Sequence, residues 1–176
     1  MALVVDELAT QSGVHVTTID PLRLQLPFPG QPGQFPDQEV LQSAVRRATG
    51  VILATPEYHG GFAAVMKLVI ENLGFPSLLA GKPVALLGVA AGQIGAIKSL
   101  KQLRSVCSHV GAIVLPGPVS VAGVQRLFDE QGRCLDAAVE KRIRGVATGL
   151  LEYVQGSVCP RIALEQMVRA RSGKAS

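Results

Sequence analysis

Apolar residues recur along this chain in two spacings, and segments with the two spacings alternate. Short uninterrupted apolar runs bounded by glycine or proline are typical of strands buried on both faces. Such runs occur at residues 51–54, 84–90 and 112–116. Longer segments with apolar residues three and four positions apart are typical of helices. The alternation predicts right-handed βαβ units, and therefore an α/β fold with a parallel sheet.

The helical spacing begins at the N-terminus. In Met1–Gly13, Val4 and Leu8 share a face and Gly13 stands where a helix would end, although a very short strand over residues 2–5 is an alternative. The other predicted helices run from an Asp37 cap to Gly50, from Phe62 to Leu73, from Ile97 to Val110, and from an Asp136 cap to Gly156.

Three further segments complete the predicted order of elements. The alternating, β-branched run Val14–Asp20 predicts a strand. Pro21–Pro36 contains five prolines and two glycines, which predicts a long loop, either a surface connection or a functional segment. Beyond Gly156 we expect a basic, mobile end. The chain then divides into a domain of residues 1–156 and a tail of residues 157–176.

Composition and charge narrow the possible functions. The chain has 176 residues, 48% of them hydrophobic, which suits one domain with an aliphatic core. The formal charge is +4, and the segment from Ser157 onward carries four basic residues against one acid, or +3 of that total. We therefore expect no nucleic-acid-binding face on the body. The sequence shows no stretch long enough to span a membrane and no metal-ligand spacing of its three cysteines, so we predict a cytoplasmic protein with reduced thiols and no metal.

Two glycine-containing loops follow predicted strands. The first, Pro56–Gly61, joins the strand at 51–54 to a helix, and the second, Ala90–Gly95, follows the strand at 84–90. Because ligands in open α/β sheets bind outside the carboxyl ends of the strands, these loops are expected to hold one planar ligand between them. Glycine lets backbone N–H groups approach such a ligand closely.

The first loop carries a family resemblance. Thr55-Pro-Glu-Tyr-His-Gly-Gly61, with Lys67 and Asn72 in the following helix, resembles the flavin-contacting loop of the NADPH-dependent FMN reductase family. Gly81-Lys-Pro-Val84, Gly92-Gln-Ile-Gly95 and Leu127-Phe-Asp129 are similar to later segments of that family. The similarity extends from about Val14 to Val154. It implies a flavodoxin-like three-layer sandwich.

The resemblance also implies a cofactor, a reaction and a set of site residues. FMN would be bound, and a hydride from NADPH or NADH would pass through it to a flavin, a quinone or a similar small-molecule acceptor. No catalytic side chain is required. The family resemblance suggests homodimers or homotetramers, with the loop Pro21–Pro36 near the subunit contact. The implied flavin contacts are Pro56, Glu57, Tyr58, His59 and Gly60 on one wall and Ala91, Gly92 and Gln93 on the other.

The sequence departs from the family at its beginning. The family starts with a strand and a loop of the type Gly-Ser-x-Arg-x-x-Ser that holds the FMN phosphate, and we expect this chain to begin inside the following helix. Either the strands at 14–19 and 51–54 pair directly, or the reading frame starts upstream of Met1, or the Met1 segment substitutes. We therefore expect weaker FMN binding. The alternative function is a flavodoxin-fold remnant that binds no flavin and serves as an interaction or scaffold protein.

Overall fold

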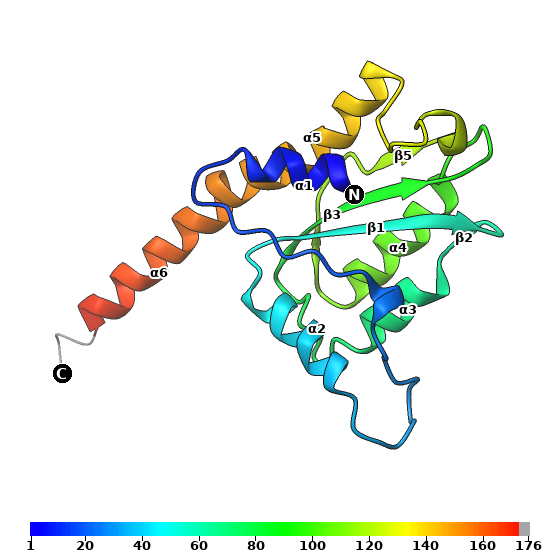
Figure 1. The fold of residues 1–176 in the computed structure, drawn as a ribbon. Coiled ribbons are helices and arrows are strands. Elements are labelled where there is room, and N and C mark those ends of the chain that lie inside the picture. Colours follow the sequence, from blue (N-terminus) through cyan, green and yellow to red (C-terminus); the bar gives the residue numbers. More distant parts are fainter. Residues whose placement is uncertain (173–176) are drawn as a thin grey trace.

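The computed structural model describes residues 1–172, which alternate between strands and helices along most of the chain (Figure 1). The helices are α1 (Ala2–Ala9), α2 (Pro36–Arg47), α3 (Ala64–Glu71), α4 (Ile97–His109), α5 (Ala137–Tyr153) and α6 (Cys159–Ser172). The strands are β1 (Val51–Tyr58), β2 (Gly61–Phe62), β3 (Pro83–Val89), β4 (Ile113–Val114) and β5 (Val119–Val121). Two 3₁₀ turns, η1 (Pro21–Arg23) and η2 (Val124–Arg126), and one π-helical turn, η3 (Val154–Val158), complete the elements.

The sheet is organised around β3. It pairs in parallel with β1 on one side, in a register that runs from Val51 opposite Val84 to Pro56 opposite Val89. On its other side β3 pairs in parallel with β4 and then with β5. The two-residue strand β2 folds back antiparallel on the end of β1. The predicted α/β fold with a mostly parallel sheet is therefore confirmed.

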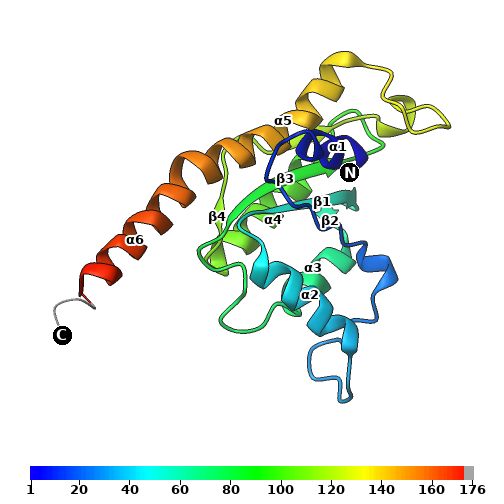
Figure 2. The same cartoon turned by 60° about the vertical axis from the view of Figure 1, so that its left-hand side comes forward.

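Helices cover both faces of the sheet, which makes three layers (Figures 1 and 2). Successive side chains of β3 point to opposite faces. Val84 and Leu86 belong to a core shared with α2, α3 and α4, whereas Ala85 and Leu87 belong to a core shared with α1 and α5. Because both faces are buried, an uninterrupted apolar run is the pattern that such a strand requires.

Most of the predicted elements are present. The strand at 51–54 is the first half of β1, the strand at 84–90 overlaps β3, and the strand at 112–116 contains β4. The N-terminal helix is confirmed, and the short strand at residues 2–5 is not formed. Asp136 caps α5 as predicted, since its carboxylate accepts hydrogen bonds from the N–H groups of Ala138 and Val139.

The predicted strand Val14–Asp20 is wrong, as is the cap at Asp37. Residues 14–20 are extended, but nothing in residues 1–172 pairs with them as a strand, and most of them are exposed. A β-branched run lacks ladder hydrogen bonds without a neighbouring strand. Along Val51–Thr55 the edge of β1 away from β3 is likewise unpaired within the described residues.

Asp37 lies in the first turn of α2, and its carboxylate accepts a hydrogen bond from the N–H of Gln25 instead.

Two predicted helix boundaries also differ. Phe62 lies in β2, so the helix predicted from there begins at Ala64. Gly156 does not end α5, because the π-helical turn η3 carries the chain into α6. Residues 157–172 are thus helical where a mobile end was expected, and residues 173–176 lie outside the described residues. The division of the chain at residue 156 stays a prediction.

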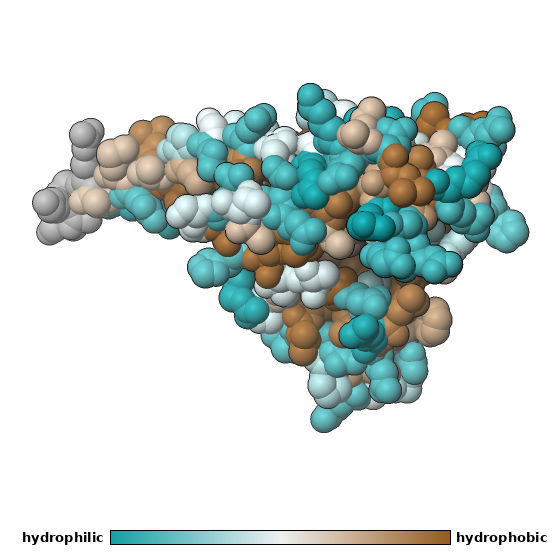
Figure 3. All heavy atoms as spheres, turned by 45° about the horizontal axis from the view of Figure 1, so that its top comes forward, coloured by the Kyte–Doolittle hydropathy of each residue, from teal (hydrophilic) through white to brown (hydrophobic). Residues whose placement is uncertain are grey.

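Helix α6 extends away from the sheet (Figures 1 and 2). Apolar colours appear along it in Figure 3, and its exposed apolar side chains include Ile162, Leu164 and Met167. Within residues 1–172 no helix is both long enough and apolar enough to cross a membrane. Cys107 lies on the buried face of α4, and burial raises the pKa of its thiol to about 11.

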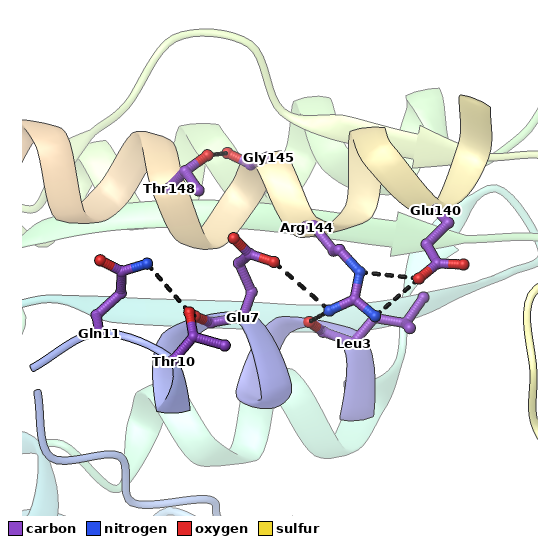
Figure 4. Close-up of polar contacts among 8 residues, drawn as sticks. All are labelled: Leu3, Glu7, Thr10, Gln11, Glu140, Arg144, Gly145 and Thr148. Atoms are coloured by element: carbon purple, nitrogen blue, oxygen red, sulfur yellow. Dashed lines mark hydrogen bonds and ion pairs between the residues drawn. The ribbon is translucent and has the colours of Figure 1, made fainter. Parts of the chain in front are cut away.

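A polar contact joins α1 to α5 beside the second core (Figure 4). The guanidinium of Arg144 lies 2.7 Å from Glu140 on its own helix and 3.5 Å from Glu7 on α1. It also donates a hydrogen bond to the carbonyl of Leu3. The hydrogen bond to Glu140 raises the pKa of Arg144, so the cation is present at any physiological pH.

We predict that Arg144→Met lowers the free energy of unfolding, because the charged group makes hydrogen bonds to Glu140 and Leu3 that a thioether cannot replace. Urea titration followed by circular dichroism measures the change. Lys141→Met is the matched control, since Lys141 is exposed on the same helix, and it should change stability little. Equal effects of the two substitutions would contradict this role of Arg144.

Candidate functional site

The first loop of the predicted site is a tight hairpin rather than an irregular loop. Tyr58, the last residue of β1, pairs with Gly61, the first residue of β2. The two residues between them, His59 and Gly60, have φ angles of 49° and 77°. Two-residue hairpins of this kind need positive φ at both central positions, which glycine adopts freely and histidine tolerates. Thr55 fixes the start of the turn by accepting a hydrogen bond from the N–H of Ala63.

The second loop, residues 91–95, lies beside this hairpin. It follows β3 directly, and Pro56 and Val89 are paired in the parallel ladder, so both loops leave the sheet at the same edge. Figure 1 shows both at the right-hand end of β1 and β3. A third segment supports the second loop, because the N–H of Gly123 donates to the carbonyl of Gly92.

Free backbone donors gather on these two loops. In the described part of the chain, the N–H groups of His59, Gly60, Ala91, Gly92 and Gln93 donate no hydrogen bond to a protein acceptor. Neighbouring side chains on both loops are exposed, including those of Tyr58 at 64% and Ile94 at 74%. A Cβ added at Gly92 would meet nothing within 4 Å, so the surface above it is open. An aromatic ring with carbonyl oxygens along one edge suits such a platform.

One predicted contact residue turns its side chain away from the platform. Glu57 accepts a hydrogen bond from the backbone N–H of Ser99, in the first turn of α4, at 3.0 Å. Its backbone stays in the ladder with β2. Gln102, one turn further along α4, donates to the carbonyl of Gly60 at 3.3 Å. The hairpin is thus fastened to α4 by side chains on both sides.

The structure brings the eight predicted residues together in two groups. Pro56, Glu57, Tyr58, His59 and Gly60 form the end of β1 and its turn, and Ala91, Gly92 and Gln93 form the exposed crest of the second loop. Sequence reasoning missed the support from Ser120, whose hydroxyl accepts a hydrogen bond from Ala96 N–H at 2.8 Å. The alternating triplet Val119–Val121 was the signal for the strand that carries it.

Two pockets lie elsewhere on the molecule. One, of about 240 Å³, is lined by Pro27, Phe28, Phe35 and neighbouring residues of the long loop. The other, of about 370 Å³, lies under the junction of α5 and α6 and includes Lys82 and Arg161. Burial lowers the pKa of Lys82, whose ammonium group donates to carbonyls at the end of α2. In residues 1–172 no group of three or more acidic, histidine or cysteine side chains is arranged to hold a metal.

A model of the NADPH-dependent FMN reductase family matches residues 1–126 of the chain. The chain belongs to this family. The match covers both loops of the candidate site, and it begins earlier and ends earlier than the predicted similarity from Val14 to Val154. The class predicted from the sequence, an NAD(P)H-dependent FMN oxidoreductase, is the class to which the chain belongs.

Relatives with curated names agree with this family. The chain is 32% identical over 152 residues to an NAD(P)H-dependent FMN reductase of Pseudomonas aeruginosa, covering 85% of this chain and 78% of that protein. It is 32% identical over 121 residues to a quinone reductase of Escherichia coli, covering 66% and 64% of the two chains. The chain spans about half the length of some other curated relatives. None of these relatives is named as an interaction or scaffold protein.

A solved structure supports the fold of this FMN reductase family member. The flavoenzyme NAD(P)H:(acceptor) oxidoreductase from Paracoccus denitrificans superposes with a TM-score of 0.69, covering 88% of this chain and 87% of that one. The sequence identity between them is 20%. The likeness confirms the predicted flavodoxin-like fold.

We predict opposite outcomes for two glycine substitutions in the second loop. Gly95 has φ +76°, and a Cβ there would lie 2.5 Å from the hydroxyl oxygen of Ser120. Gly95→Ala should therefore lower the free energy of unfolding by about 1–3 kcal/mol. Gly92→Ala, with open space at its Cβ, should stay within about 0.5 kcal/mol of the wild type. Urea denaturation of both variants measures this, and a stable Gly95→Ala protein would show that the loop is built differently.

Proposed function

We propose that this chain binds FMN between the hairpin Pro56–Gly61 and the loop 91–93 and uses it to pass a hydride from NADPH or NADH to a small-molecule acceptor. Five unpaired backbone N–H groups on two adjacent loops are the observation that carries the proposal. Flavin and quinone acceptors are supported by the names of the relatives in Pseudomonas aeruginosa and Escherichia coli. We also propose that it works in the cytoplasm, consistent with its three free cysteines.

The protein's part in such a reaction is binding and orientation. The amides of His59 and Gly60 on one wall, and those of Ala91–Gln93 on the other, would hold the polar edge of the ring. Tyr58 would flank it. FMN, when bound, supplies the acceptor position for the hydride and passes two electrons onward. No side chain of this set needs to exchange a proton. This fits the inward orientation of Glu57, whose carboxylate is engaged by the N–H of Ser99.

The test combines binding and turnover. Adding the protein to FMN should quench flavin fluorescence with saturation, and the mixture should oxidise NADPH or NADH when a quinone is supplied. Gly92→Val should weaken FMN binding by about tenfold or more, a loss of about 1.4 kcal/mol per tenfold, because a side chain there stands where the ring would lie. Its melting temperature serves as the control for folding.

Two results would count against this function. If FMN fluorescence is unchanged at saturating protein, the chain is not a flavin enzyme and the non-flavin alternative stands. If FMN binds but Gly92→Val binds it as tightly as the wild type does, the flavin site lies elsewhere on the molecule.

We propose in addition that two or four copies of the chain associate through the long loop Pro21–Pro36. Asn72 at the end of α3 donates a hydrogen bond to the carbonyl of Pro27, so the loop is held against α3. Phe28 on this loop is 69% exposed, and Phe75 in the turn after α3 is 101% exposed. Aromatic side chains are enriched in the cores of protein interfaces.

Replacing these aromatic residues should disrupt the assembly. We expect the wild type to sediment as a dimer or tetramer and the double variant Phe28→Ser, Phe75→Ser to sediment as a smaller species, because the apolar contact is lost. Leu135→Ser, an exposed apolar residue in a different region, is the control and should leave the assembly intact. A wild type that sediments as a monomer rules this interface out.

A further inference from the structure

The carboxylate of Glu57 joins two parts of the site that are far apart in the sequence. Glu57 lies at the end of β1, one residue before the hairpin's pair Tyr58 and Gly61. Ser99, whose N–H it binds, is fully buried in the first turn of α4. Helix α4 begins at Ile97, immediately after the second loop. This hydrogen bond, together with the one from Gln102 to the carbonyl of Gly60, connects the hairpin to the helix that follows the opposite wall.

The first turn of α4 depends on this contact. Its N-cap residue is Ala96, which has no side chain able to accept from the free N–H groups at the helix start. Two side chains from other segments replace a local cap. Ser120 accepts from the N–H of Ala96, and Glu57 accepts from the N–H of Ser99. The hydroxyl of Ser99 donates to the carbonyl of Ala96 and closes the turn.

Charge adds a second effect to this geometry. The N-terminus of a helix carries a partial positive charge, which a carboxylate complements. Among the described residues, Glu57 is the acid that contacts the start of α4. Lys98, in the same turn of α4, has its side chain against Gly60. The hydrogen bond from the N–H of Ser99 fixes this negative charge at the start of α4.

We propose that Glu57 is the positioning residue of the flavin site. Its carboxylate holds the hairpin at a fixed place relative to the second loop, and its charge lowers the tendency of a flavin bound there to accept electrons. The inference rests on the proposed function and adds to it a residue that sets both cofactor affinity and reduction potential. Glu57 acts through Ser99 and the backbone, so it does not exchange protons with the substrate.

Two substitutions separate the two effects. Glu57→Gln keeps an oxygen that can accept from Ser99 and removes the charge. Glu57→Ala removes both. Glu152→Gln on α5, an exposed acid that the site does not use, is the matched control. The readouts are the dissociation constant for FMN, the midpoint potential of the bound flavin and hydrogen–deuterium exchange of the protein without FMN.

Glu57→Ala should weaken FMN binding by about ten- to a hundredfold, the equivalent of one hydrogen bond to a charged group. The amides that are hydrogen-bonded around the two loops, those of Ala63, Gly95, Ala96 and Ser99, should exchange faster than in the wild type. Glu57→Gln should bind FMN with nearly wild-type affinity and should raise the midpoint potential, because less negative charge opposes reduction. A residue with only a structural role would leave the potential of the Gln variant unchanged.

The results distinguish this inference from the proposed function. If the wild type binds FMN and Glu57→Ala binds it equally well, the positioning role is wrong although the function stands. If Glu57→Gln leaves the potential at its wild-type value, the electrostatic part is wrong. If the wild type binds no FMN, the proposed function fails. The exchange rates of the hydrogen-bonded amides of Ala63, Gly95 and Ala96 in Glu57→Ala then decide on their own whether Glu57 holds the two loops together.

Discussion

The parallel pairing of β1 with β3 determines where everything else in this structure lies. Six consecutive residue pairs fix the register, and the side chains of β3 enter two separate cores on opposite faces of the sheet. Each fully buried aliphatic side chain contributes about 1.5–3 kcal/mol. A shift by one residue would exchange the two faces, so the register is strongly specified. With the register set, the hairpin after β1 and the loop after β3 must emerge side by side.

Placing two loops together does not by itself give them a fixed separation. That comes from the start of α4, which accepts anchoring side chains from both neighbouring segments, Glu57 from the hairpin and Ser120 from β5. Buried Ser99 connects these contacts. The free amides therefore lie on loops whose backbone is fixed by contacts with the start of α4. A bound cofactor needs this kind of pre-organisation.

The sequence predicted the parts of this structure that local chemistry decides. The apolar runs identified β1, β3 and β4, and the Asp136 carboxylate capped α5 as expected, because these signals lie within a few residues of the structure that they specify. The two site loops were also predicted, since glycine and proline mark the ends of the strands. The resemblance carried by Thr55–Gly61 identified the family, which the family match confirms.

What the sequence missed depends on contacts between distant segments. Val14–Asp20 has the composition of a strand, but no strand in residues 1–172 pairs with it. Asp37 looked like a cap, yet its carboxylate bonds to Gln25 N–H in the preceding loop. Gly156 was predicted to end the last helix, but it lies within the π-helical turn η3, which continues into α6. The inward orientation of Glu57 could not be inferred either, because Ser99 is 42 residues away.

The most direct test of the account is an amide NMR titration of the ¹⁵N-labelled protein with FMN. The account predicts that saturable shifts concentrate at the amides of His59, Gly60, Ala91, Gly92 and Gln93, because these donors have no protein acceptor. The shift at Ser99 should be small, since its N–H stays bonded to Glu57. Shifts centred instead on the pocket that includes Lys82 and Arg161, or no shifts at saturating FMN, would contradict this account.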